Sequence, residues 1–281
     1  AVQRLQDTDT LALIGFAVLP PDPNIGAAPN HLFQIVNNVG RISDKTGTLV
    51  SSFTLRSFFA LDPSTNEADP RVLFDAGSQR WFATYAQSNA TTSSVVLAVS
   101  TSSDPTGSFC RYRLGNPTLE TFVQDFPQLG VSDDKVVVAF DGFSFAGPNI
   151  GAGYYVLNKG DLIGCAPSAR VVRVPPDPSR FTEFPVQSLS STSALYLAMN
   201  NESSLSVFAI SGVPGGAPVV ETPAALPIRP WTVPPNAPQK GSGVLLDTGP
   251  ATVLSAGWRA NSLWVAGNEA CVPPGDVSTR S

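Results

Sequence analysis

The sequence predicts an all-β protein, and within that class a β-propeller of about five four-stranded blades. Apolar runs of about four to eight residues, bounded by Gly, Pro, Asn or Ser, recur along the whole chain, as strands do. The 26 prolines and 23 glycines are spread along the chain, which indicates frequent chain reversals. A repeated motif of an acidic residue, a proline, a strand, a tight turn and a second apolar strand begins at Asp69, Asp125 and Glu183. The intervals are 56 and 58 residues, and a period of about 50 is typical of propellers.

The predicted strands fall into groups along the chain, one group for each blade. The first group comprises residues 11–18, 31–37 and 49–55. The next three groups have four strands each, at 71–74, 81–85, 94–100 and 109–114, then at 128–131, 136–141, 152–158 and 170–174, then at 186–189, 194–199, 204–210 and 217–220. A proline-rich crossing over residues 223–238 leads to a final group at 243–246, 252–256 and 263–266.

The final group lacks one strand. We therefore expect residues 11–18 to supply it and to close a five-bladed ring, in a single domain that covers residues 1–281. Ring closure would remove the exposed sheet edges that an unfinished sheet leaves open to aggregation. The alternative is that the 281 residues form part of a longer ring of six or seven blades.

Composition limits the classes of partner. The net charge is −5 and no basic run is present, which works against nucleic-acid binding. The longest apolar stretches, such as residues 11–19, have about half the length of a membrane span, so none is expected. The sequence starts at Ala1 without a methionine, which we interpret as a processed N-terminus after loss of a secretory leader. The predicted location is extracellular.

Cysteines and glycosylation sequons agree with secretion. Cys110, Cys165 and Cys271 are too few for a disulfide scaffold and have no zinc-type spacing, so we expect a single bridge whose pairing is open. Asn89 and Asn201 each begin an N-x-S/T triplet in a predicted polar turn, where a glycan could project into water. Such triplets also arise by chance about once or twice in a chain of this kind.

The order of several motifs resembles a group of secreted β-propeller proteins, mostly uncharacterised, from bacteria and some algae. The matching pieces are Pro20-Pro21-Asp22-Pro23-Asn24, Pro29-Asn30-His31, Asp69-Pro70-Arg71-Val72 with Asp75, Arg80-Trp81, Ala98-Val99-Ser100, Asp104-Pro105-Thr106-Gly107, Asp125-Phe126-Pro127-Gln128-Leu129-Gly130-Val131, Leu245-Leu246-Asp247, Gly257-Trp258-Arg259 and Leu263-Trp264. This resemblance covers most of the chain and implies the fold, but it lends no activity. Residues 102–109 also look like the Asp-box turn of sialidase-like propellers, but the glycine falls one residue late and only one copy is present, so a plain type I turn is the favoured interpretation.

Three acidic residues are the candidate catalytic groups. Asp69, Asp125 and Glu183 each precede the innermost strand of successive blades, so they are expected to converge near the axis. In this respect they are similar to the three blade-borne carboxylates of arabinanase-type glycosidases, which serve as base, modulator and acid. Such chemistry needs one protonated and one ionised carboxyl group around a gap of sugar size. Calcium coordination by the same oxygens is an alternative. Both hypotheses fail if the acids only accept hydrogen bonds from neighbouring backbone amides and order the strand entries.

Other candidate groups are few. His31 is the only histidine, which excludes a multi-histidine metal site, and no Gly-x-Ser-x-Gly nucleophile elbow is present. Trp231 lies in a proline-rich loop and is the best candidate for an exposed contact with the apolar face of a sugar.

The leading functional hypothesis is an extracellular, glycosylated β-propeller that binds or scaffolds carbohydrate, or cell-wall or surface proteins, without catalysis. No cofactor is predicted beyond the calcium alternative. A rival hypothesis is a glycoside hydrolase or lyase that uses Asp69, Asp125 and Glu183. A third is a subunit of an extracellular assembly, for which the proline-rich crossing would be a docking surface.

Overall fold

A computed structural model describes residues 5–116, 119–201, 203–272, 274–275 and 278–279, and these residues confirm the predicted all-β fold. Blade 1 consists of β1 (Asn24–Ala27), β2 (His31–Val36), β3 (Val39–Asp44) and β4 (Leu49–Thr54). Blade 2 consists of β5 (Asn66–Asp75), β6 (Arg80–Ser88), β7 (Ser93–Ser100) and β8 (Phe109–Leu114). Blade 3 consists of β9 (Phe122–Val131), β10 (Lys135–Ser144), β11 (Asn149–Asn158) and β12 (Val171–Asp177).

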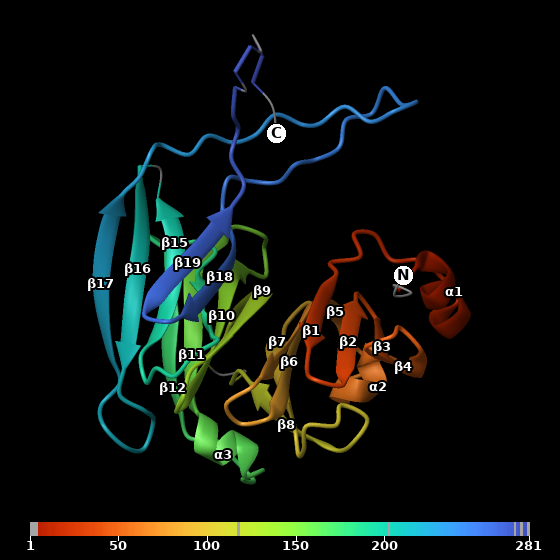
Figure 1. Cartoon of the computed structure of the whole chain (residues 1–281), viewed down its shortest axis with the longest axis vertical. Helices are drawn as coiled ribbons and strands as arrows, with labels where there is room; N and C mark the ends of the chain where they lie inside the picture. Colours follow the sequence, from red (N-terminus) through yellow and green to blue (C-terminus); the bar gives the residue numbers. More distant parts are fainter. Residues whose placement is uncertain (1–4, 117–118, 202, 273, 276–277, 280–281) are drawn as a thin grey trace.

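Blade 4 consists of β13 (Phe184–Pro185), β15 (Leu195–Asn201), β16 (Ser204–Ser211) and β17 (Val220–Pro227). The short strand β14 (Gln187–Ser188) continues the first strand of this blade, and a hairpin of β18 (Val253–Arg259) and β19 (Ser262–Gly267) follows. The described residues also form the short helices α1 (Asp7–Ile14), α2 (Leu55–Phe59) and α3 (Lys159–Ile163). Figure 1 shows β1–β8 on one side of the molecule and β9–β19 on the other.

The blades pack face to face, as in a propeller. Each blade is an antiparallel meander, and one buried apolar cluster lies between each pair of consecutive blades. Trp81 of β6 belongs to the cluster between blades 1 and 2, where it is fully buried and its ring centroid lies 5.8 Å from that of Phe33. Burial of an aromatic side chain of this size is among the larger apolar contributions to stability.

The first strands of the blades meet at a common axis. Strand β5 lies against β1 and β9, and β9 lies against β13. Strand β14 pairs in parallel with both β9 and β18, through Gln187 with Val131 and Gln187 with Gly257. The described residues therefore form four four-stranded blades and the first two strands of a further blade around this axis.

The predicted closing strand at residues 11–18 is wrong. Residues 11–14 belong to α1, and 15–18 belong to no strand. At the start of the helix, the N–H of Gln6 donates a hydrogen bond to Asp9 Oδ2 at 2.9 Å, and the helix ends at Gly15, whose φ of 83° is a left-handed conformation that suits glycine. Blade 1 instead contains two strands that were not predicted, β1 and β3. The predicted strand at 243–246 is also wrong, because this segment contributes only an isolated bridge between Leu246 and Ala237.

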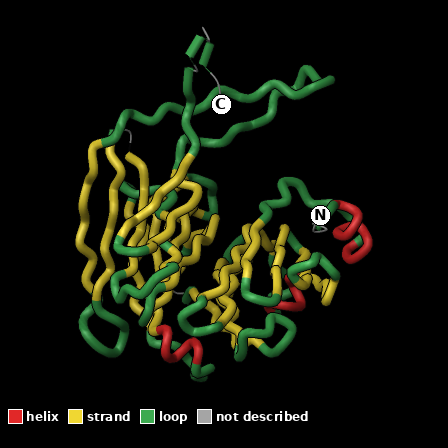
Figure 2. Tube along the Cα trace, in the orientation of Figure 1, coloured by secondary structure: helices red, strands yellow, loops and turns green. Residues whose placement is uncertain are grey.

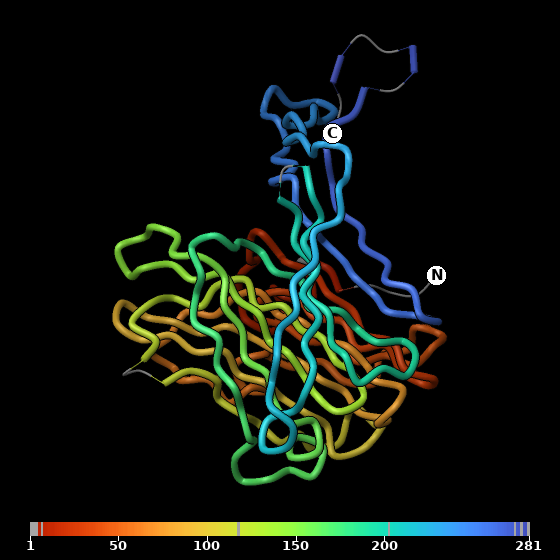
Figure 3. The backbone as a smooth tube through the Cα atoms, turned by 90° about the vertical axis from the view of Figure 1, so that its left-hand side faces the viewer, coloured from red at the N-terminus to blue at the C-terminus, as the bar shows by residue number. Residues whose placement is uncertain are grey.

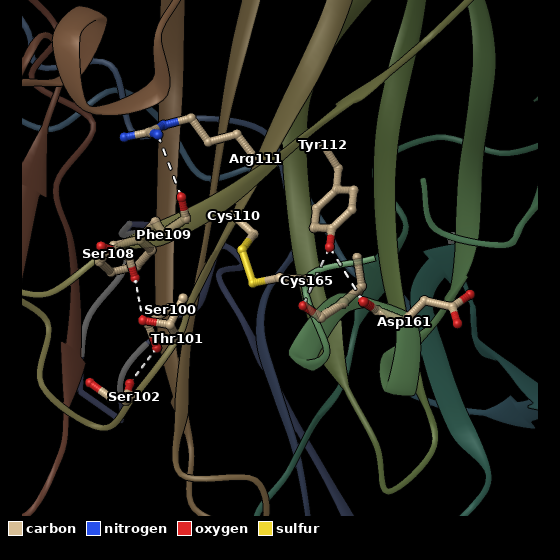
Figure 4. Close-up of a disulfide and its surroundings, with 11 residues drawn as sticks. Ser100, Thr101, Ser102, Ser108, Phe109, Cys110, Arg111, Tyr112, Asp161 and Cys165 are labelled. Carbon is tan, nitrogen blue, oxygen red and sulfur yellow. Dashed lines mark hydrogen bonds between the residues drawn. A yellow bond between two sulfur atoms is a disulfide. The ribbon is translucent and has the colours of Figure 1, made fainter. Parts of the chain in front are cut away.

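The expected single disulfide is confirmed and joins two blades (Figure 4). Cys110 lies in β8 of blade 2, and Cys165 follows α3 of blade 3; their Cα atoms are 5.7 Å apart. All three cysteines lie in the described ranges, and Cys271 is exposed and unpaired.

Both sequon asparagines lie at strand ends. Asn89 follows β6, and its side-chain oxygen accepts hydrogen bonds from the backbone N–H groups of Thr91 and Thr92. Asn201 is exposed at the end of β15, and Glu202 within its sequon lies outside the described residues. Glycosylation of Asn89 and Asn201 stays a prediction.

The segment between β17 and β18 projects from the sheets and has little regular structure (Figures 2 and 3). None of the helices in the described ranges is long and apolar enough to span a membrane.

Candidate functional site

A cavity of about 230 Å³ lies where the first strands of the blades meet. Residues of β1, β5, β9, β13, β14 and β18 line it, and its polar lining residues are Asn24, Arg71, Gln128, Gln187 and Ser255. We call it the axial cavity. Its size lies just below the usual range of small-molecule pockets, which is about 300–1,000 Å³.

Two polar side chains of the cavity wall have atoms that no described group satisfies. Gln128 of β9 is 1% exposed; its Nε2 donates a hydrogen bond to the carbonyl of Phe126 at 3.2 Å, and its Oε1 is buried without a partner. The Nε of Arg71 in β5 is also buried without a partner. The Arg71 guanidinium lies 5.0 Å from the centroid of the Phe126 ring, which holds the side chain in place.

Asp69 and Asp125 come together beside Arg71. Asp69 lies in a bulge of β5 with φ of 59°, and its N–H donates a hydrogen bond to the side-chain oxygen of Asn37 at 3.0 Å. Its carboxyl group shares a hydrogen bond with that of Asp125. Burial, followed by the negative charges of Asp125 and Asp22, raises the pKa of Asp69 to about 7. Asp69 is therefore a carboxyl group that holds its proton close to neutral pH.

Glu183 is the most buried of the three predicted acids, at 2% exposure. One of its oxygens accepts a hydrogen bond from Arg180 at 3.0 Å, and the other is buried without a partner. Burial raises the pKa of Glu183 to about 7, although the Arg180 guanidinium acts in the opposite direction. Arg180 is shared, because it also forms an ion pair with Glu221.

Asp141 is a further buried carboxyl group near these acids and was not predicted from the sequence. It lies in β10 directly opposite Asp125, and its carboxylate accepts hydrogen bonds from the N–H of Thr182 at 2.7 Å and the hydroxyl of Thr182 at 2.9 Å. Burial and the charge of Asp125 raise its pKa, and its own charge contributes to the raised pKa of Glu183. Asp141 is the last residue of the predicted strand at residues 136–141 and has no acid-proline motif, so no sequence signal separates it from an ordinary strand residue.

The structure thus places the carboxyl groups of Asp69 and Asp125 within hydrogen-bonding reach of each other, and the charge of Asp141 contributes to the raised pKa of Glu183. The carboxyl groups of Asp69 and Glu183 form hydrogen bonds with other side chains and not only with backbone amides. Within the described part of the chain, no group of three or more His, Cys, Asp and Glu side chains is arranged to hold a metal ion.

The predicted aromatic contact, Trp231, is half-buried. Its ring lies against Gly267 of β19, where a Cβ atom would come within 2.7 Å of it. The tryptophan with an open face is Trp264 of β19, which is 68% exposed. Trp258 of β18 stacks on Tyr196, with ring centroids 5.0 Å apart.

The raised pKa of Asp69 predicts how stability changes with pH. Its pKa is about 7 in the folded protein and about 3.8 in an unperturbed carboxyl group, so the folded state holds more protons between these values. The free energy of unfolding therefore falls as the pH rises from about 4 to about 7. Asp69→Asn cannot titrate, so we expect its thermal midpoint to fall less between about pH 5 and about pH 8 than that of the parent. Calorimetric scans across this range measure the difference.

Asp44→Asn is the matched control for this experiment. Asp44 is partly exposed, and its hydrogen bond from the Thr46 hydroxyl, with further bonds at the same turn, holds its pKa below the usual value. It titrates below the tested range, so the variant should retain the pH slope of the parent. An Asp69→Asn protein with the full slope of the parent would contradict the assignment of the proton to Asp69, and would point to the other carboxyl groups with raised pKa values, Glu183 and Asp141, as the source of the slope.

No protein-family model matches this sequence. No curated protein sequence matches it significantly. Among solved structures, the chain is similar to a subtype N11 neuraminidase-like protein of a flat-faced bat strain (H18N11), with 9% identity and a TM-score of 0.43 over 92% of this chain and 69% of the other. It is similar to the polysaccharide lyase Uly1, with 9% identity and a TM-score of 0.49 over 92% of this chain and 56% of the other. It is similar to an exo-β-1,3-galactanase from Clostridium thermocellum, with 11% identity and a TM-score of 0.41 over 79% of this chain and 51% of the other.

Proposed function

We propose that this protein is an extracellular, non-catalytic β-propeller that binds carbohydrate in the axial cavity. The observation that carries the proposal is that Arg71 and Gln128 both line the cavity and each has one buried side-chain atom without a partner, the Nε donor of Arg71 and the Oε1 acceptor of Gln128. Buried polar groups without partners are costly, so a wall that holds an unpaired donor and an unpaired acceptor is suited to a polar, uncharged ligand. Sugars supply many hydroxyl groups of this kind. The Cys110–Cys165 disulfide supports an oxidising, extracellular location.

The contact between Asp69 and Asp125 favours binding over hydrolysis by this pair. Glycosidases separate their two carboxyl groups by about 5–5.5 Å in retaining enzymes and by about 6.5–9.5 Å in inverting enzymes, so that the scissile bond fits between them. Two carboxyl groups that share a hydrogen bond leave no such gap. Asp69 and Asp125 therefore fit the role of a proton-holding pair better than that of acid and nucleophile.

Glycoside hydrolysis or elimination is a second candidate function, supported by the raised pKa of Glu183. A carboxyl group with a pKa of about 7 can serve as a general acid at neutral pH. Incubation of the protein with a panel of polysaccharides, followed by analysis of reducing ends and unsaturated products, tests this candidate. Turnover by the parent that disappears in a folded Glu183→Gln protein would favour the enzyme over the binding protein.

Binding of glycans by the intact chain tests the proposed function. We expect a glycan array and titration calorimetry to show binding, and Arg71→Met to weaken it by roughly 10- to 100-fold, because a hydrogen bond from a charged group to the ligand is lost. Arg259→Met is the matched control, since Arg259 is exposed at the end of β18 and does not line the cavity. Absence of binding to every glycan, or equal affinity of the Arg71→Met and parent proteins, would contradict the proposal.

A further inference from the structure

Strand β19 is the open edge of an unfinished blade. Each of blades 1 to 4 has four strands, whereas the described residues of the last blade form only β18 and β19. Strand β19 pairs with β18 on one side, and no described strand pairs with it on the other. Alternate residues of such a strand direct their backbone N–H and C=O groups away from the sheet. These groups can form a ladder of hydrogen bonds with one further strand.

The outermost strands of the complete blades are protected against such pairing, and β19 is not. Arg113 lies in β8 of blade 2, Pro175 in β12 of blade 3 and Pro223 in β17 of blade 4, and the helices α1 and α2 contact β4 of blade 1. Charged residues, prolines and covering segments at a sheet edge hinder pairing with other chains. Strand β19 has the sequence SLWVAG, with neither a charged residue nor a proline. This composition is typical of an inner strand, which has a neighbour on both sides.

The same chain carries an apolar segment that lacks a partner. Residues 228–252, which we call the arm, connect β17 to β18 and project from the sheets (Figures 2 and 3). Val244, Leu245 and Leu246 are consecutive in the arm and are 69%, 54% and 50% exposed. We call these three residues the apolar run. Consecutive exposed apolar residues are unusual unless they contact a partner. The sequence predicts a strand at this position, and the structure leaves it outside every sheet.

Hydrogen bonds fix the base of the arm beyond the end of β19 of its own chain. Asn268, which directly follows β19, donates from Nδ2 to the carbonyl of Thr248 at 3.0 Å and accepts from the N–H of Thr252 at 3.2 Å. The two sides of the arm are joined by the bridge between Ala237 and Leu246. The apolar run would have to give up these bonds to fold back onto β19 of the same chain. A second copy of the chain can offer its β19 without that loss.

We infer that the apolar run of one copy adds as a strand to the free edge of β19 in a second copy, and that the protein self-associates through this contact. Each copy has one arm and one edge, so two copies can exchange arms and form the contact twice, in a closed dimer. The side chains of the added strand would lie beside those of β19, among them Trp264, which is 68% exposed. This inference does not depend on carbohydrate binding.

Sedimentation velocity of the full chain over about 1–100 µM tests the inference. All proteins carry Cys271→Ser, so that no disulfide between copies can form through this exposed thiol. We expect a concentration-dependent dimer. Leu245→Asp in the arm and Trp264→Lys in β19 should each weaken dimerisation by roughly tenfold or more, because each brings a charge into the contact between strands.

Matched controls place the same charges elsewhere on the surface. Leu49→Asp changes a leucine of β4 that is 51% exposed, close to the exposure of Leu245, and Phe16→Lys changes an exposed aromatic residue near α1. Both controls lie on the side of the molecule that holds β1–β8 (Figure 1), and they should dimerise as the parent does.

A mixture of the two variants identifies the surfaces that meet. The Trp264→Lys protein keeps an intact arm and the Leu245→Asp protein keeps an intact edge, so an equimolar mixture should recover part of the dimerisation. Two weakened variants that do not recover on mixing would overturn the pairing of arm with edge. A parent that stays monomeric at every concentration, or a Leu245→Asp protein that dimerises as the parent does, would overturn the inference. If Trp264→Lys does not fold, Leu245→Asp decides, because the arm lies outside the sheets.

Discussion

Replacement of Cys110 and Cys165 together by serine is expected to lower the free energy of unfolding by about 4 kcal/mol. The two residues are separated by 55 positions in the sequence, and a cross-link over a loop of that length removes much of the conformational freedom of the unfolded chain. The bridge also fixes β8 of blade 2 to the segment that follows α3 in blade 3. Urea unfolding of the parent and the double variant, monitored by tryptophan fluorescence, measures the difference.

Cys271→Ser provides the control for the disulfide experiment. Cys271 is exposed and unpaired, so its replacement should change the free energy of unfolding by less than about 0.5 kcal/mol. Addition of a reductant should move the parent toward the double variant and leave the double variant itself unchanged. A double variant as stable as the parent would show that the remaining contacts between blades 2 and 3 hold this interface without the bridge.

Lys159→Met is expected to destabilise the protein by about 3–5 kcal/mol, because it leaves a buried carboxylate without its cation. Lys159 lies in α3 of blade 3, and its Nζ is 2.7 Å from Asp75 Oδ2 at the end of β5 in blade 2. The two side chains are 5% and 7% exposed. Burial alone would raise the pKa of Asp75, but the hydrogen bonds and charge of Lys159, together with hydrogen bonds from Ser78, hold this pKa below its usual value.

The double variant Lys159→Met/Asp75→Leu distinguishes an unpaired charge from a loss of packing. Replacement of a whole buried ion pair by apolar residues is often neutral, so the double variant should recover most of the stability that Lys159→Met loses. In Lys159→Met alone, the pKa of Asp75 should rise above its unfolded value, so the deficit should become smaller as the pH falls through that range. Denaturant unfolding at several pH values provides both measurements. A double variant that is less stable than Lys159→Met would indicate that the Lys159→Met protein loses stability through poorer packing and not through an unpaired charge.

The strands in the middle of the chain could be predicted because their signals are local. Residues 94–100 and 136–141 are apolar runs bounded by turn residues, and both are buried strands in the structure, within β7 and β10. The same kind of signal led to the wrong prediction of a strand at residues 11–18. A short apolar run is compatible with a helix or a strand, and the capping residues around α1 decided the outcome.

The candidate site was predictable only in part. The acid-proline repeat located Asp69 and Asp125, because repetition of a structural unit places equivalent residues at equivalent points around an axis. Arg71 and Gln128 carry no comparable signal, since an arginine and a glutamine in strands are ordinary residues. That each has a buried side-chain atom without a partner, and that both line one cavity, became visible only when β5 and β9 were placed side by side.

The sequence alone determined the all-β class, the repetition of four-stranded units and the presence of a single disulfide, because strand periodicity, turn residues and cysteine count are properties of short segments or of composition. The tertiary structure decided which cysteines pair, that the N-terminal segment lies outside the sheets, and that Asp141 lies opposite Asp125. These features depend on contacts between residues far apart in the chain. Such contacts form only when the blades pack against one another. A local sequence pattern does not show which distant residues will then lie close together.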